Sequence, residues 1–222
     1  MKSIFACTVM LAFATAADGQ VRRRVPPPVE PSMWVGLSAG LFNANDVSDG
    51  ATSSTWDFGQ ASTPQYRLAV EKAISGSISI GAVGSYANVP LTYIGRSGDN
   101  SCSRCAAHLD VVALGASFHL GGRSGFHQVL EASAGALQYR NLRRDSDDSR
   151  LAPLDGNVDP YFTFGYGFGY GFGRNTQVSV VQDFGLALHE REGLSSEQSN
   201  TLRQRTIRAN FRYGLGNRAR RR

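Results

Sequence analysis

The stretch DPYFTFGYGFGYGFGRN, residues 159–175, alternates aromatic and small side chains almost without interruption. Rings occupy the even positions, at Phe162, Phe164, Tyr166, Phe168, Tyr170 and Phe172. The odd positions between them hold Thr163 and four glycines. Because successive side chains of a β-strand point to opposite faces, this stretch predicts a strand with rings on one face and almost nothing on the other.

Seven more segments show the same period of two, and no segment carries a helical stripe longer than about ten residues. The predicted strands cover 33–42, 65–74, 76–90, 106–121, 126–140, 159–173, 175–189 and 201–215. Their connections alternate between tight turns, at 75–76, 121–125 and 173–175, and long polar segments, at 43–64, 91–105, 141–158 and 190–200. The pattern is typical of an all-β fold, an eight-stranded antiparallel up-and-down transmembrane β-barrel with four extracellular loops.

The volume of the lumen decides which face of these strands points outward. An eight-stranded barrel has an interior just wide enough for side chains to fill, so six inward rings from one strand would crowd it. Glycines facing water would bring little benefit to a strand. We therefore expect the rings to face lipid, together with Phe211 and Tyr213 of the last strand. The alternative is a soluble lipocalin-like barrel, in which the apolar face points inward.

The opposite face of the strands carries six charged residues, which are Arg67, Glu71, Glu131, Asp183, Arg208 and Arg212. Three acids match three bases, and charges in a narrow interior must be paired. The sequence predicts a network of ion pairs in a filled lumen. In a soluble barrel the same charges would be solvent-exposed and worth about 0–1 kcal/mol each.

A few residues do not fit the alternation. Gln182 and Lys72 have the lipid-facing parity, although Lys72 lies near the rim, where a lysine can extend toward water. Leu137 and Tyr139 have the lumen parity of Glu131. A bulge near Gly135, or departure of the strand from the membrane, is the expected reason.

The start of the chain is typical of a secretory signal, with Lys2, the short apolar run SIFACTVMLAFA and small residues at 14–16. A buried N-terminal strand is the less favoured alternative. The predicted organisation is a signal peptide at 1–17, an Arg/Pro-rich periplasmic linker at 18–32, the barrel at 33–216 and a basic tail at 217–222.

Charge and cysteine content narrow the remaining possibilities. The net charge of +5 comes in part from arginine clusters at 22–24 and 220–222. Such clusters can bind nucleic acid or anionic lipid, but solvated termini are favoured here and no nucleic-acid partner is expected. Cys102 and Cys105 remain after signal removal, and in a secreted chain we expect them to form a loop disulfide. No second CxxC completes a zinc set, and no thioredoxin-like βαβ unit supports a redox motif.

Four features of the chain are typical of one family: the signal segment, the eight strands, the alternating loop lengths and the aromatic strand YFTFGYGFGYGF. Across about residues 33–216, the chain resembles the OmpA/OmpX-like family of small bacterial outer-membrane β-barrels. The resemblance implies location in the bacterial outer membrane, contact with its lipid, and a monomer inserted by the barrel assembly machinery. In that family a terminal aromatic residue is read by this machinery. Here ANFRYGLG is similar, but the basic NRARRR follows it.

We expect a structural, envelope-integrity or surface-contact role, with possible ligands bound through the loops, and no enzyme activity or cofactor. One alternative is a lipid-modifying acyl hydrolase or transferase, which needs a serine, a histidine and an acid. Its candidates are Ser101, Ser103, His108, Asp110, His189 and Glu190, whereas His119 and His127 complete the set of histidines. The GxSxG match GLSAG, at 36–40, lies within a predicted strand and lacks the strand-to-helix turn of a lipase-type nucleophile. A narrow pore is the other, less favoured alternative. GYGFGYG lacks the context of a phosphate loop, and no nucleotide, haem or metal site is expected.

Overall fold

The computed structural model describes residues 30–59, 62–95, 102–153, 158–196 and 198–216. The expected signal peptide, nearly all of the linker and the basic tail lie outside these residues. No helix in the described part of the chain is long and apolar enough to cross a membrane.

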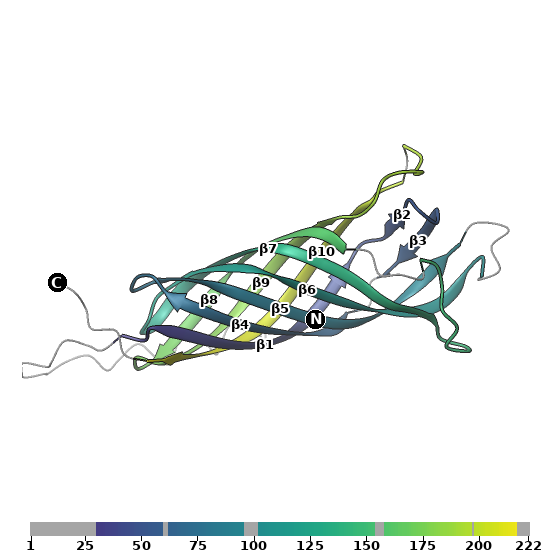
Figure 1. Cartoon of the computed structure of the whole chain (residues 1–222). Coiled ribbons are helices and arrows are strands. Elements are labelled where there is room, and N and C mark those ends of the chain that lie inside the picture. Colours follow the sequence, from purple (N-terminus) through teal and green to yellow (C-terminus); the bar gives the residue numbers. More distant parts are fainter. Residues whose placement is uncertain (1–29, 60–61, 96–101, 154–157, 197, 217–222) are drawn as a thin grey trace, which may run out of the picture.

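Eight strands close an antiparallel barrel (Figure 1). They are β1 (Met33–Ala44), β4 (Thr63–Ala73), β5 (Ile78–Ile94), β6 (Cys105–Gly121), β7 (Gly125–Arg144), β8 (Val158–Phe172), β9 (Thr176–Leu188) and β10 (Thr201–Leu215). Neighbours along the chain pair with one another, β1 pairs with both β4 and β10, and pairing of β5 with β6 completes the cylinder. The predicted eight-stranded barrel is thereby confirmed, with boundaries that differ by a few residues.

The connections at the two ends of the barrel differ in length. At one end, called the turn end here, β4, β6 and β8 pass to the next strand through residues 74–77, 122–124 and 173–175. Gly125 and Gly173 have positive φ angles at these turns, which only glycine adopts without strain. The other end, called the loop end, carries the long connections (Figure 1).

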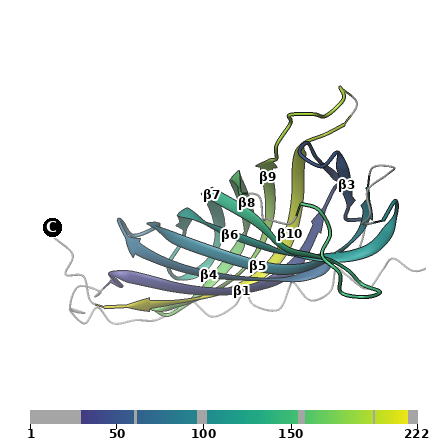
Figure 2. The same ribbon diagram turned by 45° about the vertical axis from the view of Figure 1, so that its right-hand side comes forward.

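The first long connection is not the polar loop that the sequence predicts. It contains two short strands, β2 (Val47–Asp49) and β3 (Ser54–Asp57), which form a hairpin. β3 also pairs with the end of β5, from Thr55 opposite Ile94 to Asp57 opposite Thr92. This hairpin lies at the loop end of the barrel (Figures 1 and 2). Val47, Trp56 and Phe58 are buried, so burial of apolar side chains explains why the segment folds.

The outer wall of the barrel is apolar. The eight aromatic residues predicted to face lipid all lie on this wall and are 39–55% exposed. Phe126 of β7 stacks on Phe168 of β8, with ring centroids 5.5 Å apart. Lys72 is exposed at the turn end, opposite Met33. Gln182 faces outward, but its amide donates hydrogen bonds to the carbonyl oxygens of Asp183 and Thr206 at 3.2 and 3.3 Å, which partly satisfies it.

The glycines of β8 face inward, and the space they leave is used by neighbouring strands. A Cβ atom on Gly167 would overlap with the carbonyl oxygen of Val180, and one on Gly165 would overlap with the carboxylate of Asp183. The alternation of rings and glycines therefore meets two requirements at once, an apolar exterior and a close approach of β9 to β8.

We expect Gly167→Val to destabilise the folded barrel by about 1–3 kcal/mol, because the added side chain has no room in the lumen. Urea unfolding of protein folded into lipid vesicles measures the change. Ala209→Val is the matched control, since Ala209 is exposed on the outer wall. Equal stability of Gly167→Val and the control would contradict the close approach of β8 and β9.

Candidate functional site

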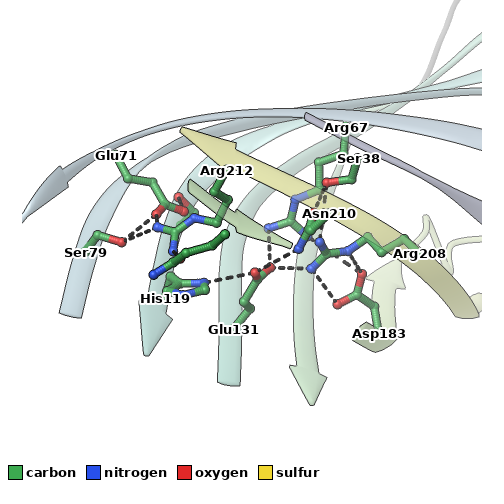
Figure 3. Close-up of polar contacts among 12 residues, drawn as sticks. Ser38, Arg67, Glu71, Ser79, His119, Glu131, Asp183, Arg208, Asn210 and Arg212 are labelled. Carbon is green, nitrogen blue, oxygen red and sulfur yellow. Dashed lines mark hydrogen bonds and ion pairs between the residues drawn. The ribbon is translucent and has the colours of Figure 1, made fainter. Parts of the chain in front are cut away.

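The structure places the six charged residues predicted for the lumen inside the barrel. Five are buried and Arg67 is half-buried, and every one of them has an oppositely charged partner. They come from β4, β7, β9 and β10, which are held together by pairing around the cylinder. Figure 3 shows that they gather in two groups, which lie at different depths along the lumen.

The group nearer the turn end is centred on Glu71 and Arg212, which form an ion pair. Ser79 donates a hydrogen bond to Glu71 at 2.6 Å and accepts one from Arg212 at 2.8 Å. Arg212 also donates to Gln177 at 2.9 Å, and its guanidinium lies 4.9 Å from the ring centroid of Trp34. These contacts connect five strands, so protein groups from around the barrel hold the pair in place.

The second group is centred on Arg208, which pairs with both Glu131 and Asp183. Arg67 lies 3.5 Å from Glu131 and 3.8 Å from Asp183, so two guanidinium groups share two carboxylates. His119 and Asn210 bond the other oxygen of Glu131 at 3.0 and 3.2 Å. Removing one member of such a buried set leaves an uncompensated charge, which is strongly destabilising.

The lumen toward the loop end has a different character. An apolar cluster fills it, and its largest fully buried members include Trp56, Tyr93, Phe42, Leu109 and Leu137. The expected bulge near Gly135 is wrong, because β6 and β7 stay in register there and shift only between His108 and Asp110. Leu137 and Tyr139 point into this cluster, with exposures of 0% and 3%. Their parity is that of the lumen, and the lumen at that height is apolar.

A buried ionic cluster joins the β2–β3 hairpin to the barrel. His189, which follows β9, bonds Asp159 of β8 through Nδ1 at 2.9 Å and Asp49 of β2 through Nε2 at 3.0 Å. The rings of Trp56 and Tyr139 lie 5.1 and 5.3 Å from the imidazole. We call Asp49, His189 and Asp159 the hairpin latch, because they link the hairpin to two barrel strands.

The electrostatics of the hairpin latch favour a charged imidazole. Burial by itself lowers the pKa of His189, but the hydrogen bonds to Asp159 and Asp49 outweigh it and raise this pKa to about 9. Burial raises the pKa of Asp49, yet hydrogen bonds from His189 and Thr52 bring it below its usual value. The sequence offers His189 only as a candidate residue for acyl transfer. Its parity, shared with inward-facing Asp183 and Ala187, is the signal that could have placed it inside.

The candidates for acyl transfer that the structure describes do not assemble into a nucleophilic site. His108 bonds Asp145 at 2.7 Å, and His127 bonds the carbonyl oxygen of Gly125 at 2.9 Å. Asp110 instead accepts hydrogen bonds from Tyr86, Asn88 and Asn141 on the outer wall. Ser101 lies outside the described residues. Each ring nitrogen of His189 faces a carboxylate, an arrangement that suits an imidazolium ion rather than a base activating a serine.

Cys102 and Cys105 form a disulfide at the loop end, where Cys105 begins β6. Both cysteines pack against the apolar cluster of the lumen. Among the described residues, no group of three or more histidine, cysteine, aspartate or glutamate side chains is arranged to hold a metal ion.

Comparison with solved structures identifies the architecture. Neisserial surface protein A matches 83% of this chain and 97% of its own, with 13% identity and a TM-score of 0.50. The chain has the fold of the small outer-membrane β-barrels. Other solved barrels are also similar, with TM-scores below 0.5. One is Ail of Yersinia pestis, which is 10% identical, matches 82% of this chain and 99% of its own, and has a TM-score of 0.42. Another is the N-terminal barrel domain of Pseudomonas aeruginosa OprF, which is 14% identical, matches 84% of this chain and 100% of its own, and has a TM-score of 0.41.

Sequence comparisons find no such relative. No protein-family model matches the chain. No curated protein matches it significantly either. The small outer-membrane barrel fold is therefore recognised here by strand order, register and the direction of side chains rather than by sequence identity.

We expect Glu131→Gln to destabilise this outer-membrane barrel fold by about 3–5 kcal/mol, because Arg208 and Arg67 would share one remaining carboxylate. Urea unfolding in vesicles measures the loss. Asp147→Asn is the control, since Asp147 pairs with Arg144 at the exposed loop end, where an ion pair is worth about 0–1 kcal/mol. If the two variants lose the same stability, the lumen pairs do not hold the barrel together.

The hairpin latch predicts a stability that depends on pH. The pKa of His189 is raised from 6.5 to about 9 in the folded state, so its contribution is complete below pH 6.5 and disappears as the pH rises through 9. Asp49 has a lowered pKa, and its contribution disappears as the pH falls below about 3.8. The stability difference between wild type and His189→Gln should therefore be largest near pH 5–6.5.

Trp56 offers a direct readout of this latch, because it contacts His189 and the chain has only one other tryptophan, Trp34. In a Trp34→Phe background, the fluorescence of Trp56 should report exposure to solvent at lower urea concentration at pH 10 than at pH 6. A pH-independent difference between wild type and His189→Gln would show that the imidazole is not charged in the folded state.

Proposed function

We propose that the protein is a non-conducting β-barrel of the bacterial outer membrane that supports the envelope and presents its loop end to the surroundings. One observation carries this proposal, namely that inward-facing side chains occupy the lumen both near the turn end and near the loop end. Two ion-paired groups occupy the part near the turn end, and an apolar cluster occupies the part near the loop end. Such an interior leaves the outer wall and the loop end as the surfaces available for contact.

The dimensions of the wall support insertion into a membrane. On β10 the outward face is apolar over the nine residues from Ile207 to Leu215, and on β1 over the nine from Met33 to Leu41. A tilted transmembrane strand needs about 9–11 residues to cross the hydrocarbon. By analogy with other barrels, short turns face the periplasm and long loops face outward. The turn end would then be periplasmic and the loop end extracellular.

The loop end is built as a firm platform. The β2–β3 hairpin is joined to β5 by pairing and to β8 and β9 by the hairpin latch, and the Cys102–Cys105 disulfide shapes the connection before β6. A preordered surface loses less entropy on binding than a flexible one. This supports a surface-contact role in which a ligand meets the loops.

Export and assembly complete the proposal. Residues 1–17 act as the signal peptide, residues 18–32 as a periplasmic linker and residues 217–222 as a basic periplasmic tail. The barrel assembly machinery reads β10, whose outward face ends in Phe211, Tyr213 and Leu215. The folded unit acts as a monomer, a role that fits the pairing of β5 with β6, which leaves the eight barrel strands no open edge for pairing with another copy.

The full-length precursor expressed in a Gram-negative host should fractionate with the outer membrane after signal cleavage. Unheated protein should migrate faster on a gel than boiled protein, as a compact barrel does. In planar bilayers it should give no steps of conductance above background, with an established large porin as the positive control. Stable, ion-selective steps would refute the closed lumen, whereas loss of the protein from the membrane fraction would refute the location.

A further inference from the structure

The outward face of β10 changes character toward the loop end. From Leu215 back to Ile207 this face is apolar, but the next two outward positions are Arg205 and Arg203. Both arginines are exposed, while their inward-facing neighbours Gln204 and Thr206 are buried. Two consecutive outward positions of one strand lie on the same face, about 7 Å apart. The two arginines therefore lie next to each other, directly beyond the apolar part of the outward face of β10.

The described residues around the two arginines supply no counter-charge. Arg203 lies opposite Leu186 of β9, and Arg205 lies opposite Phe184 of β9 and Asn43 of β1. Within the described residues, neither guanidinium forms an ion pair with a carboxylate, in contrast to Arg208 and Arg212, which face inward on the same strand. Two adjacent cations are therefore left without an acid in the described part of the chain, free to interact with a ligand.

The backbone at this position is firmly held. The amide of Arg203 donates a hydrogen bond to the side-chain oxygen of Asn45 at 2.5 Å, and its carbonyl accepts one from the amide of Asn45 at 3.1 Å. Asn45 thereby extends the pairing of β1 with β10 beyond the end of β1. The positions from which both arginine side chains start are fixed by the barrel rather than by a loose loop.

The depth of the pair follows from the length of the strand. Nine residues from Leu215 to Ile207 cross the hydrocarbon, so Arg205 and Arg203 come next, at the boundary with the headgroups on the loop side. An arginine on the lipid face costs about 2–4 kcal/mol at the midplane and about 0–1 kcal/mol near an interface. Interfacial depth is thus the favourable one for this pair.

We propose that Arg203 and Arg205 bind the phosphate groups of a phosphorylated glycolipid in the outer leaflet. This inference rests on the proposed outer-membrane location and orientation. Each guanidinium can donate two parallel hydrogen bonds to one phosphate, which is the geometry that makes arginine the preferred phosphate ligand. Acyl chains of the same molecule would lie against Phe184, Leu186 and Ile207, which are exposed directly beside and below the pair.

The site belongs to one side of the barrel. On the far side, at the same end, the wall carries the carboxylate of Asp110, which accepts hydrogen bonds from Tyr86, Asn88 and Asn141, with the exposed Arg140 opposite it. A carboxylate repels phosphate, so the wall is not uniformly attractive to anionic headgroups. A bound lipid phosphate is therefore expected on the face formed by β9, β10 and β1.

The test uses the mature full chain folded into detergent micelles, with folding checked first by heat-modifiable migration. Binding of fluorescent bis-phosphorylated lipid A is titrated for wild type, for Arg203→Gln/Arg205→Gln and for a control, Arg150→Gln/Arg191→Gln. The control removes two exposed arginines of the loop end and so matches the change in net charge. The dissociation constant should rise about thirtyfold for the first pair and stay within about twofold for the control.

Two further arms identify the ligand. Lipid A with both phosphates removed should bind wild type about as weakly as intact lipid A binds Arg203→Gln/Arg205→Gln. Inorganic phosphate at millimolar concentration should not displace the labelled lipid, because it lacks the acyl chains that contact the wall.

Each contrary result overturns the proposal. Equal losses in both variants would indicate attraction to overall charge, tight binding of the dephosphorylated lipid would remove the role of phosphate, and displacement by inorganic phosphate would indicate a free-anion site. These results leave the proposed closed barrel intact as long as the wild type folds in micelles. A wild type that does not fold in micelles would reject the proposed function together with this inference.

Discussion

The pairing of Arg208 with Glu131 and Asp183 is the constraint on which the barrel depends. Arg208 is 2% exposed, so its charge must be compensated by carboxylates from other strands. Those carboxylates lie on β7 and β9, and Arg67 of β4 shares them. A slip of one residue in β10 would turn Arg208 toward lipid and Ile207 toward the carboxylates. The ion pairs therefore select one register among those that hydrogen bonding alone would permit.

The two layers of the lumen follow from different requirements. Near the turn end, Glu71, Arg212 and the Arg208 group fill the interior with polar contacts that are satisfied only when all strands are in place. Near the loop end, apolar side chains fill it, and they would be exposed to water without a cover. The β2–β3 hairpin provides that cover by inserting Val47 and Trp56, and the hairpin latch fixes it at the same depth. A charged imidazole between two carboxylates is tolerated there because both of its nitrogens are bonded.

Much of this arrangement could be predicted from the sequence, because a strand in a closed barrel has only two faces. Phe164 and Gly165 have opposite parity, as do Ile207 and Arg208. Once the volume of the lumen is considered, this parity decides which side chain of each pair faces outward and which faces inward. The bulge expected to explain Leu137 and Tyr139 is wrong, because parity identifies the inward face but not its chemistry, which changes along the barrel axis. Asp49 could not be placed at all, since its position depends on a hairpin that folds only against the assembled barrel. His189 could have been placed by parity, but its partners could not.

A filled interior also shifts the question of function to the surface. Since each inward charge of the predicted network has a protein partner, the lumen offers little free-energy gain to a ligand that would have to replace those contacts. The outer wall is different, because its apolar part is satisfied by acyl chains while Arg203 and Arg205 have no partner in the described chain. The same strand thus carries arginines of two kinds. Arg208 and Arg212 face inward and hold the barrel closed, and the outward pair carries charge to the boundary where the protein meets its surroundings.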